Sequence, residues 1–397
     1  MNERELPLAG LNVIEFTHMV MGPTAGLVLA DMGASVTKVE PLKGDNTRRL
    51  KGSGAGYFAM YNRNKRSICL DLKSAAGKEA AFRLLKDADV LIENFRPGAM
   101  DKLGFGYEEL SRINPALVYC SLKGFLSGPY ERRTALDEVT QMMGGLAYMT
   151  GLPDRPLRAG TSVIDITGGM FGVIAILSAI EQRHRTGLGQ LVTSSLFETT
   201  AFLVGQHIAQ QGVLGVIPPP MSVRTSAWAI YEIFESADGE KIFVAVVSDS
   251  LWKLFCDEFQ LTDFANDPTL NSNNQRVEQK DRIVPVIRDM FAGMEKAEMI
   301  SRLEKAGIPF APVNRPADLV DDPHMNASGA LVELTLSEGD TAGKKIKLPA
   351  LPVEMDHRKF GLHRDLPARG VDSLEILKEL GYSAKECESM LEQGLVR

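Results

Sequence analysis

Residues 11–40 read LNVIEFTHMVMGPTAGLVLADMGASVTKVE, and their hydrophobic period changes twice. The apolar run at 11–16 predicts a short strand, residues 24–33 have helical spacing, and residues 34–40 return to the alternation of a strand. Pro23 stands at the expected first helical position and Gly33 at the expected C-terminal cap. The stretch therefore predicts a β-α-β unit.

The same rhythm continues further along the chain. Strands are predicted at 66–72, 89–95 and 116–125, and Ser74 is an expected N-cap for a helix through Ala88. Strands that alternate with helices favour an α/β fold whose parallel sheet is covered on both faces. Ligands of such sheets bind beyond the carboxyl ends of the strands. Those ends are predicted at 16–23, 94–98 and 123–128.

A second long helix is predicted at 165–185, where a basic last turn and Gly187 provide a stop signal. Its uncharged core, residues 166–180, is shorter than the roughly 20 residues of a membrane span. We therefore expect a buried core helix and no membrane partner.

Three consecutive prolines at 218–220 indicate a domain boundary. We expect a large Rossmann-like domain at 1–212, to which residues 330–397 return. The insert at 225–325 is expected to be a smaller α+β domain. The segments 213–224 and 326–340 are expected to be linkers.

The charge balance is acidic, with 44 Lys and Arg against 51 Asp and Glu and a formal net charge of −7. Long-range attraction to nucleic acid is thereby disfavoured. The four cysteines are widely spaced, without a CxxC pair, and the first ten residues lack the apolar core of a signal peptide. These features predict reduced thiols and a cytoplasmic location.

Several common catalytic signatures are missing from the sequence. It contains no GxSxG, no HExxH and no GxGxxG after the first strand, and GDTAGKK at 339–345 is one residue short of a P-loop. The six histidines include no pair with the spacing of a metal-binding helix face, so no metal site is expected.

Two residues remain as candidates for chemistry. His18 lies in the first predicted β-α loop, where it either bonds backbone groups or contacts a nucleotide. Asp165 lies between two isoleucines at the start of the long helix. It is either an N-terminal cap or a desolvated carboxylate that acts as a covalent nucleophile, with Gly168 and Gly169 leaving room for substrate.

Several blocks in this order resemble the class III, or formyl-CoA transferase-like, CoA-transferases, which include carnitine CoA-transferases and have α-methylacyl-CoA racemases as relatives. The resemblance covers nearly the whole chain. It is carried by residues 8–40, YNRNKRSICLDLKSAAGKE, DVLIENFRPGAMDKLGFGYEEL, NPALVYCSLKGF, the Asp165 block, RHRTGLGQ and AGIPFAPVN.

The resemblance implies that Asp165 is the catalytic aspartate, which forms a mixed anhydride with the acyl group and then an aspartyl-CoA thioester. Coenzyme A enters as a thioester substrate, and no permanently bound cofactor is implied. The family positions that contact CoA fall on His18, Met21, Leu70, Lys73, Asn94, Phe95, Arg96 and Lys102.

A cluster of basic residues is expected to hold the CoA phosphates, although each member could equally be a solvated surface charge. Its members are Arg48, Arg49, Arg63, Lys65, Arg66 and Lys73.

Two departures from the family pattern bear on the substrate. Leu136 stands where the racemases carry a histidine and where transferases often carry an aromatic residue, which argues against racemization. Residues 244–250, VAVVSDS, stand near the position of the glycine run of the formyl-CoA enzymes, which makes formyl-CoA and oxalate less favoured.

The preferred expectation is therefore transfer of CoA from succinyl-CoA to a small dicarboxylate such as itaconate, mesaconate, glutarate or malate. The alternatives are a formyl-CoA:oxalate-type transferase, an acyl-CoA racemase or isomerase, and a non-catalytic nucleotide-binding or scaffold protein. The resemblance also implies a homodimer of two interlocked, ring-shaped chains.

Overall fold

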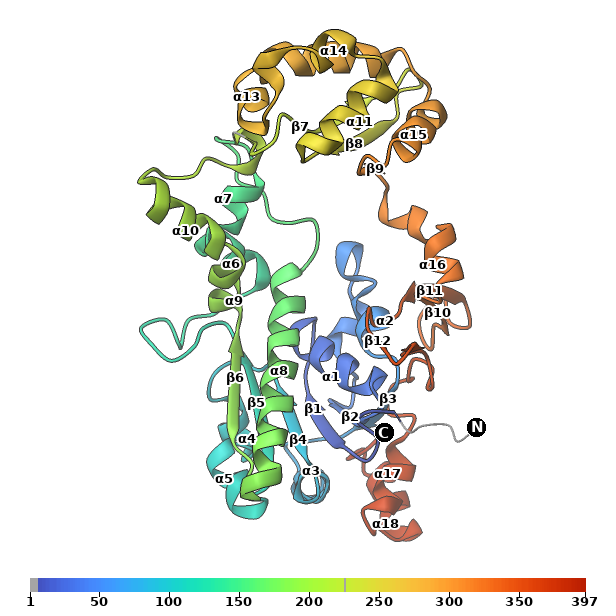
Figure 1. The fold of residues 1–397 in the computed structure, drawn as a ribbon. Coiled ribbons are helices and arrows are strands. Elements are labelled where there is room, and N and C mark those ends of the chain that lie inside the picture. The colour runs from blue at the N-terminus through green and yellow to red at the C-terminus, as the bar shows by residue number, and fades with distance from the viewer. Residues whose placement is uncertain (1–5, 225) are drawn as a thin grey trace. The chain divides into compact units, whose positions relative to one another are not determined.

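The computed structural model describes residues 6–224 and 226–397. The chain forms two compact units (Figure 1). The larger contains the described residues up to Ser222 and those from Pro323 to Arg397, and the smaller is Val223–Asp322. Each unit has its own hydrophobic core.

The larger unit is built on a six-stranded parallel sheet in the order β3-β2-β1-β4-β5-β6. This is the strand order of the doubly wound dinucleotide-binding fold. The strands are β1 (Asn12–Phe16), β2 (Ser35–Glu40), β3 (Lys65–Cys69), β4 (Val90–Glu93), β5 (Val118–Lys123) and β6 (Leu191–Ser195). The predicted Rossmann-like α/β architecture is confirmed.

Both faces of this sheet are buried. Val13 of β1 belongs to the core on one face and its neighbour Ile14 to the core on the other. Helices α1 (Met21–Asp31) and α8 (Val163–Thr186) pack on the first face, and α3 (Ala75–Lys86) lies on the second. This two-sided burial explains why the strands are continuous apolar runs in the sequence.

The predicted helix at 24–33 begins earlier, at Met21, so Pro23 is its third residue and not its first. Proline is tolerated there because the first N–H groups of a helix have no partner within it. Gly33 follows the helix with φ +104°, a conformation that favours glycine. Ser74 caps α3 as predicted, since its hydroxyl accepts a hydrogen bond from the Gly77 N–H.

The C-terminal segment packs against the edge of this sheet. Helices α17 (Ser373–Glu379) and α18 (Ala384–Glu392) join the core under β3. The Asp372 carboxylate accepts from the Ser67 N–H at 2.8 Å, and Val396 forms a β-bridge with Leu70. The end of the chain thus completes the larger unit.

The smaller unit contains an antiparallel sheet of β7 (Ile230–Glu235), β8 (Lys241–Val246) and β9 (Phe310–Pro312). Its helices are α11 (Asp249–Phe259), α12 (Thr262–Ala265), α13 (Asn273–Glu278), α14 (Lys280–Ala292) and α15 (Lys296–Lys305). The VAVVSDS segment is the end of β8 followed by the start of α11, where the Ser248 hydroxyl accepts from the Leu251 N–H. It is therefore a strand end and a helix cap, and not an open loop.

The segments expected to be linkers contain regular structure. The first holds the end of α10, Leu214, and the second holds β10, whose buried Val332 and Leu334 give it a hydrophobic face. The remaining elements are α2 (Tyr57–Tyr61), α4 (Ala99–Leu103), α5 (Tyr107–Ile113), α6 (Asp137–Met143), α7 (Leu146–Thr150), α9 (Leu196–Leu203), α10 (Gly205–Leu214), α16 (Pro323–Ala327), β10 (Leu331–Thr335), β11 (Lys345–Pro349), β12 (Glu354–Met355) and β13 (Arg358–Lys359).

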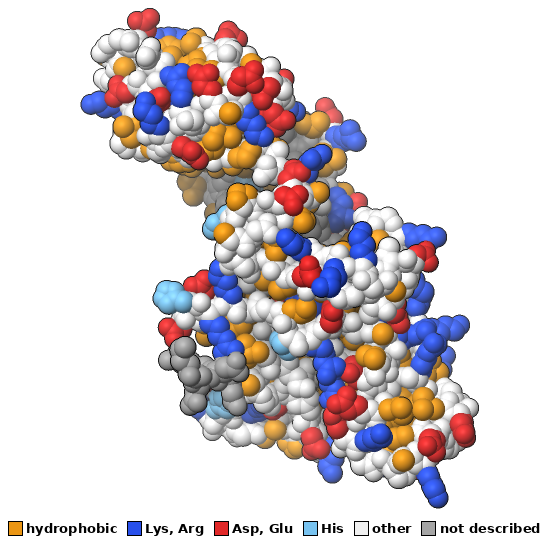
Figure 2. Space-filling model, turned by 90° about the vertical axis from the view of Figure 1, so that its right-hand side faces the viewer, with side chains coloured by type: hydrophobic (Ala, Val, Ile, Leu, Met, Phe, Trp, Pro, Cys, Tyr) orange, Lys and Arg blue, Asp and Glu red, His pale blue; other side chains and the backbone are white. Residues whose placement is uncertain are grey.

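Charged side chains of both signs are interspersed over the face of the molecule shown in Figure 2. One described helix, α8, is long and apolar enough to cross a membrane by length and composition. In this structure α8 packs against α1, β5 and β6.

Candidate active site

The loops after β1 and β4 meet where the strand order reverses, which is the place where doubly wound sheets bind ligands. Asn94 joins them: its Oδ1 accepts from the His18 N–H at 3.0 Å, and its Nδ2 donates to the His18 carbonyl at 2.8 Å. The His18 ring stacks on Phe95 with 5.7 Å between ring centroids. Desolvation by the surrounding loops lowers the pKa of His18, so the ring is neutral at pH 7.

Buried ion pairs support the first of these loops from below. Lys38, on β2, is fully buried; its Nζ donates to the Thr17 carbonyl at 2.8 Å and lies 3.1 Å from Asp45 and 3.5 Å from Glu15. Lys65, on β3, is also fully buried and lies 3.0 Å from Glu15. These bonds fix the position at which the chain leaves β1.

The predicted cationic cluster is therefore wrong for most of its members. Arg63 forms an ion pair with Asp31 at 2.6 Å inside the protein, and Arg48 forms one with Glu40 at 2.7 Å. Lys65 forms an ion pair with Glu15. Charges this deeply buried must be paired, because an isolated buried charge costs several kcal/mol. Arg66 pairs with Glu379 at the surface. Arg49 hydrogen-bonds the Lys43 carbonyl and Asn46, so Arg49 and Lys73 are the two exposed members of the cluster that form no ion pair among the described residues.

Glu93 and Lys123 hold the second loop in the same way. Lys123, at the end of β5, donates to Glu93 at 2.8 Å and to the Phe95 carbonyl at 2.7 Å. Glu93, at the end of β4, also accepts from the Ser121 hydroxyl and from the Phe95 N–H. The loop that carries Asn94, Phe95 and Arg96 is thus bonded to two strands.

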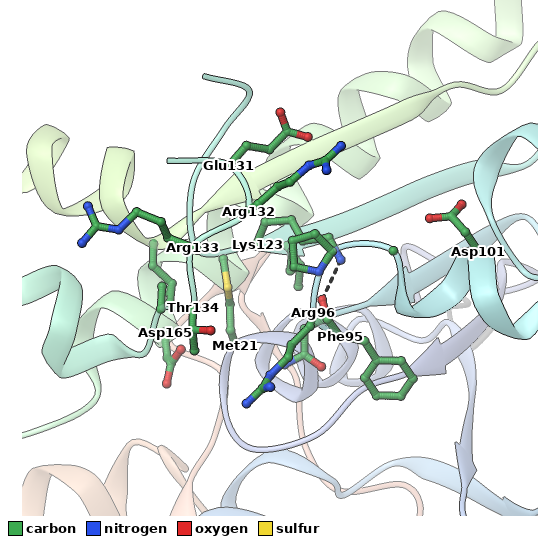
Figure 3. Close-up of a pocket in the computed structure, with 17 residues that line it drawn as sticks. Met21, Phe95, Arg96, Asp101, Lys123, Glu131, Arg132, Arg133, Thr134 and Asp165 are labelled. Carbon is green, nitrogen blue, oxygen red and sulfur yellow. Dashed lines mark hydrogen bonds between the residues drawn. The ribbon is translucent and has the colours of Figure 1, made fainter. Parts of the chain in front are cut away.

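A cavity of about 620 Å³ opens at these strand ends. Asp165 lies at one end beside Met21, Arg133 and Thr134, and Asp101 lies at the other (Figure 3). The cations that line it are Arg96, Lys123, Arg132 and Arg133. The cavity therefore brings Asp165 together with two other carboxylates, Asp101 and Glu131, and with four basic side chains.

A second cavity of about 260 Å³ lies beside the His18 loop and is mainly apolar. It is lined by Thr17, His18, Met19, Val39, Glu40, Pro41, Asp45, Asn46, Thr47 and Phe95. Met19 has a left-handed backbone conformation, φ +64°, and its N–H donates to the Thr47 hydroxyl at 3.0 Å. Backbone strain of this kind in a non-glycine residue occurs often at binding sites.

Asp165 is the third residue of α8 and is partly open to the larger cavity. Among the described residues, its carboxylate has no hydrogen bond or ion pair. Burial, together with the nearby negative charge of Asp137, raises the pKa of Asp165 to about 7, while Arg158 acts in the opposite direction. Carboxyl groups with such pKa values in clefts are candidates for catalysis.

Asp165 does not cap its own helix, which corrects the first of the two sequence readings. The N-cap residue of α8 is Ser162, whose side chain forms no capping bond. The cap comes from α6: Asp137 Oδ2 accepts from the N–H groups of Ile164 at 2.9 Å and of Asp165 at 3.1 Å. The Asp165 side chain therefore does not form the N-terminal cap that its position in the sequence suggested.

The glycines after Asp165 serve helix packing and not substrate access. A Cβ on Gly168 would lie 2.6 Å from Met21 Cε, and one on Gly169 would lie 2.5 Å from the Met21 carbonyl oxygen. Both glycines are buried where α8 crosses α1. Because they lack side chains, Met21 can approach α8 directly below Asp165.

The sequence-predicted site residues fall into three groups. Met21, Asn94, Phe95, Arg96 and Asp165 share the larger cavity, and His18 lines the smaller one with Phe95. Lys73 and Lys102 are exposed and line neither cavity, and the Leu70 side chain is buried in the core.

Sequence reasoning missed four contributors, Lys123, Arg132, Arg133 and Asp137. The consecutive arginines Arg132 and Arg133 were a signal in the sequence for a basic edge of the cavity, which we call the basic rim. Leu136 itself is 62% exposed and directly precedes Asp137. No group of three or more His, Cys, Asp or Glu side chains in the described ranges is arranged to hold a metal ion.

Comparison with known proteins identifies the family, because residues 8–373 match CoA-transferase family III. The chain belongs to CoA-transferase family III. It is 34% identical to the acetyl-CoA:oxalate CoA-transferase of Acetobacter aceti over 82% of this chain and 86% of that one. It is 32% identical to the succinate–glutarate CoA-transferase of Agrobacterium fabrum over 96% of this chain and 97% of that one.

A solved structure has the same fold. The CAIB/BAIF family protein of Brucella suis superposes with a TM-score of 0.83 at 32% identity, covering 95% of this chain and 100% of that one. Membership of CoA-transferase family III makes the protein an enzyme that transfers CoA. The resemblance noted in the sequence is thereby confirmed.

Proposed function

We propose that the enzyme transfers CoA from a donor such as succinyl-CoA to a small dicarboxylic acid, with Asp165 as the covalent nucleophile. The observation that carries the proposal is the unpaired, partly desolvated Asp165 carboxylate at the end of a cavity lined by cations. A carboxylate with few hydrogen bonds is a stronger nucleophile than a solvated one.

The reaction then proceeds by acyl exchanges in which every bond formed replaces one broken. A carboxylate oxygen of Asp165 attacks the thioester carbonyl, the C–S bond breaks, and CoA leaves as a thiolate. The thiolate attacks the aspartyl carbonyl of the mixed anhydride and releases the donor acid as a carboxylate. The acceptor carboxylate attacks the aspartyl-CoA thioester and expels the thiolate again. Attack of that thiolate on the acceptor carbonyl restores the Asp165 carboxylate, with no net proton change.

We propose that CoA lies along the two cavities. Its thioester end would be near Asp165 and Met21, and the loop of Asn94, Phe95 and Arg96 would contact its middle portion. The apolar cavity beside His18 has the character expected of a site for a flat adenine ring, since His18 and Phe95 already stack there. Lys73 and Lys102 would reach phosphates from the surface, and Leu70 would take part only through its main chain.

The basic rim supports a dicarboxylate acceptor. Arg132 and Arg133 line the cavity with Asp165, and Arg133 lies 4.8 Å from the Tyr130 ring centroid. A second carboxylate on the acceptor could pair with such a guanidinium while the first attacks. Oxalate and glutarate, named for the two relatives above, are both dicarboxylates. Leu136 in place of a histidine favours transfer over α-proton exchange.

The covalent step is tested by trapping. The enzyme is incubated with succinyl-CoA, treated with hydroxylamine, digested and analysed by mass spectrometry. A hydroxamate is expected on the peptide that contains Asp165 and is expected to be missing in Asp165→Asn. Turnover without any adduct at Asp165 would overturn the assignment of the nucleophile.

The acceptor class is tested by a matched panel. Glutarate, mesaconate, malate, itaconate and oxalate are compared with monocarboxylates of similar length, with succinyl-CoA as donor. A higher kcat/KM for the dicarboxylates, reduced mainly through KM in Arg133→Gln, is expected. Equal kcat/KM for both classes would refute the dicarboxylate assignment.

We also propose a cytoplasmic homodimer, in which the family resemblance implies interlocked rings. Large apolar side chains are exposed on neighbouring helices of the larger unit: Ile174 of α8, Phe202 of α9, and Ile208, Val213 and Leu214 of α10. An exposed apolar surface of this kind marks a contact with another molecule.

A second copy of this chain is the proposed occupant of that surface. Light scattering is expected to give twice the chain mass, and Phe202→Glu with Ile208→Glu is expected to lower it. A monomer that is fully active, or flotation of the protein with lipid vesicles, would refute the dimer.

A further inference from the structure

We propose that Asp137 is a positioning residue that sets the reactivity of Asp165 by occupying the N-terminal amides of α8. The inference deepens the proposed function and rests on Asp165 being the nucleophile. It concerns a residue to which neither the family resemblance nor the sequence pattern gave a role.

Hydrogen bonds on both carboxylate oxygens hold Asp137 in place. Asp137 is 7% exposed, and its Oδ2 accepts from the Ile164 and Asp165 N–H groups at 2.9 and 3.1 Å. Its Oδ1 accepts from Gln141 Nε2 at 2.6 Å, and Gln141 Oε1 accepts from the Ala159 N–H at 2.8 Å. The carboxylate thus ties α6, the segment before α8 and the first turn of α8 together.

These hydrogen bonds determine how much the N-terminal amides of α8 can stabilise the Asp165 anion. Free N–H groups at a helix start stabilise a nearby anion, and a carboxylate in the first turn ordinarily benefits. Here Asp137 takes the two nearest amides and adds a negative charge. Asp165 is therefore held at a helix start without receiving the stabilisation that such a position usually gives an anion.

The consequence for catalysis is electrostatic. Acylation converts the Asp165 anion into a neutral anhydride or thioester, so the repulsion between the two carboxylates is relieved in each covalent intermediate. Asp137 would raise the basicity of the nucleophile and favour its acylation, while leaving Asp165 itself as the group that reacts.

Other charged and titratable groups lie around Asp165 and Asp137. Arg158 lies 3.5 Å from Asp137 and offsets part of its charge, and it also lies 3.6 Å from Glu138. In α2, burial and the negative charge of Asp165 raise the pKa of Tyr61. The Tyr57 hydroxyl, also in α2, lies 3.3 Å from the Ser162 hydroxyl. The charged side chains that line the cavity with Asp165 are Arg96, Asp101, Lys123, Glu131, Arg132 and Arg133.

Asp137→Asn tests the proposal because the amide oxygen can still accept from the α8 amides without carrying a charge. If the Asp165 midpoint falls by about one pH unit, the ionised fraction at pH 6 rises from about one tenth to about one half. A less basic carboxylate is also a weaker nucleophile, by about threefold for one unit.

The pH profile of acyl-enzyme formation should therefore cross that of the wild type. Asp137→Asn is expected to be about threefold slower at pH 8 and equal or faster at pH 6, with KM for succinyl-CoA unchanged. A merely structural role would lower the rate at every pH. A parallel loss, or an unmoved midpoint, would overturn the proposal.

Two further variants keep the test decisive. Glu138→Gln removes the neighbouring charge but touches no α8 amide in the described structure, and it is expected to leave the midpoint within about 0.3 units. Arg158→Gln removes the offsetting cation and is expected to move the midpoint upward, so it reports the same electrostatics if Asp137→Asn does not fold.

A direct titration separates this inference from the proposed function. Carbodiimide labelling of Asp165, followed by peptide mass spectrometry across pH without substrate, measures the midpoint of this carboxyl independently of turnover. A shifted midpoint without any trapped adduct would retain the electrostatic effect of Asp137 on the Asp165 carboxyl and refute Asp165 as nucleophile. An adduct at Asp165 with an unshifted midpoint would support Asp165 as nucleophile and refute the role of Asp137.

Discussion

Asp165→Asn should stabilise the folded protein at pH 8, although it should abolish transfer. The carboxylate of Asp165 has no hydrogen bond among the described residues, and burial together with the charge of Asp137 raises its pKa from 3.8 to about 7. Keeping the ionised form in the folded state therefore costs free energy that an amide of the same shape does not require.

The sign and the size follow from linkage. Because the folded protein binds this proton more tightly than the unfolded chain does, the stability of the wild type falls as pH rises from about 4 to about 7. A shift of roughly three units corresponds to about 4 kcal/mol as an upper limit. Since the carboxylate is partly open to the cavity, we expect about 1–3 kcal/mol at pH 8. At pH 4 the group is protonated in the folded state, and the advantage of Asn should nearly vanish.

Urea unfolding at pH 8 and pH 4, at one fixed protein concentration, measures this difference. Asp154→Asn makes the same change on an exposed turn and is expected to alter stability by less than about 0.5 kcal/mol. If Asp165→Asn is less stable than the wild type at pH 8, or equally more stable at both pH values, the description of Asp165 as a destabilised carboxylate is wrong.

Four other substitutions test the framework around the site and its contact with CoA. Gly169→Ala should lower the unfolding free energy by about 1–3 kcal/mol in urea titrations, because its Cβ would lie 2.5 Å from a backbone oxygen of Met21. Gly172→Ala should cost less, since its Cβ would first meet a movable side-chain methyl at 2.8 Å; equal costs would contradict this reading of the crossing. Lys38→Met should lose about 3–5 kcal/mol by the same assay, because it leaves the buried Asp45 carboxylate without its cation and Glu15 with Lys65 alone, and an unchanged midpoint would count against the buried network. Arg96→Ala should weaken CoA binding about tenfold in calorimetry, with a smaller loss at high salt, and a loss independent of salt would argue against a phosphate contact.

Local patterns were sufficient for the sheet and for Asp165. The alternation of periods in residues 11–40 reflects strands buried on both faces and a helix between them, so it is written in contiguous sequence. Asp165 stood out because a lone carboxylate in an apolar run is unusual wherever that run lies.

The partners of the buried ion pairs could not be predicted from the sequence. Arg63 and Lys65 look like surface cations, and their burial depends on Asp31 and Glu15, which lie 32 and 50 residues away. The same holds for the cap of α8, which comes from Asp137, 28 residues before Asp165. Short-range spacing carries no information about which distant carboxylate a buried cation will meet, because that partnership is created by the order of the strands.

The raised pKa of Asp165 also bears on the direction in which a mixed anhydride on this residue would break. A thiolate can attack either carbonyl of the anhydride, and the less basic carboxylate is the better leaving group. If Asp165 is more basic than an ordinary carboxylic acid, attack at the aspartyl carbonyl expels the substrate acid more readily than attack at the substrate carbonyl expels Asp165. Cations at the rim, such as Arg133, would stabilise the departing carboxylate and strengthen that preference. The same electrostatic asymmetry that makes Asp165 a good nucleophile would thus direct the first anhydride toward the aspartyl-CoA thioester and away from simple reversal.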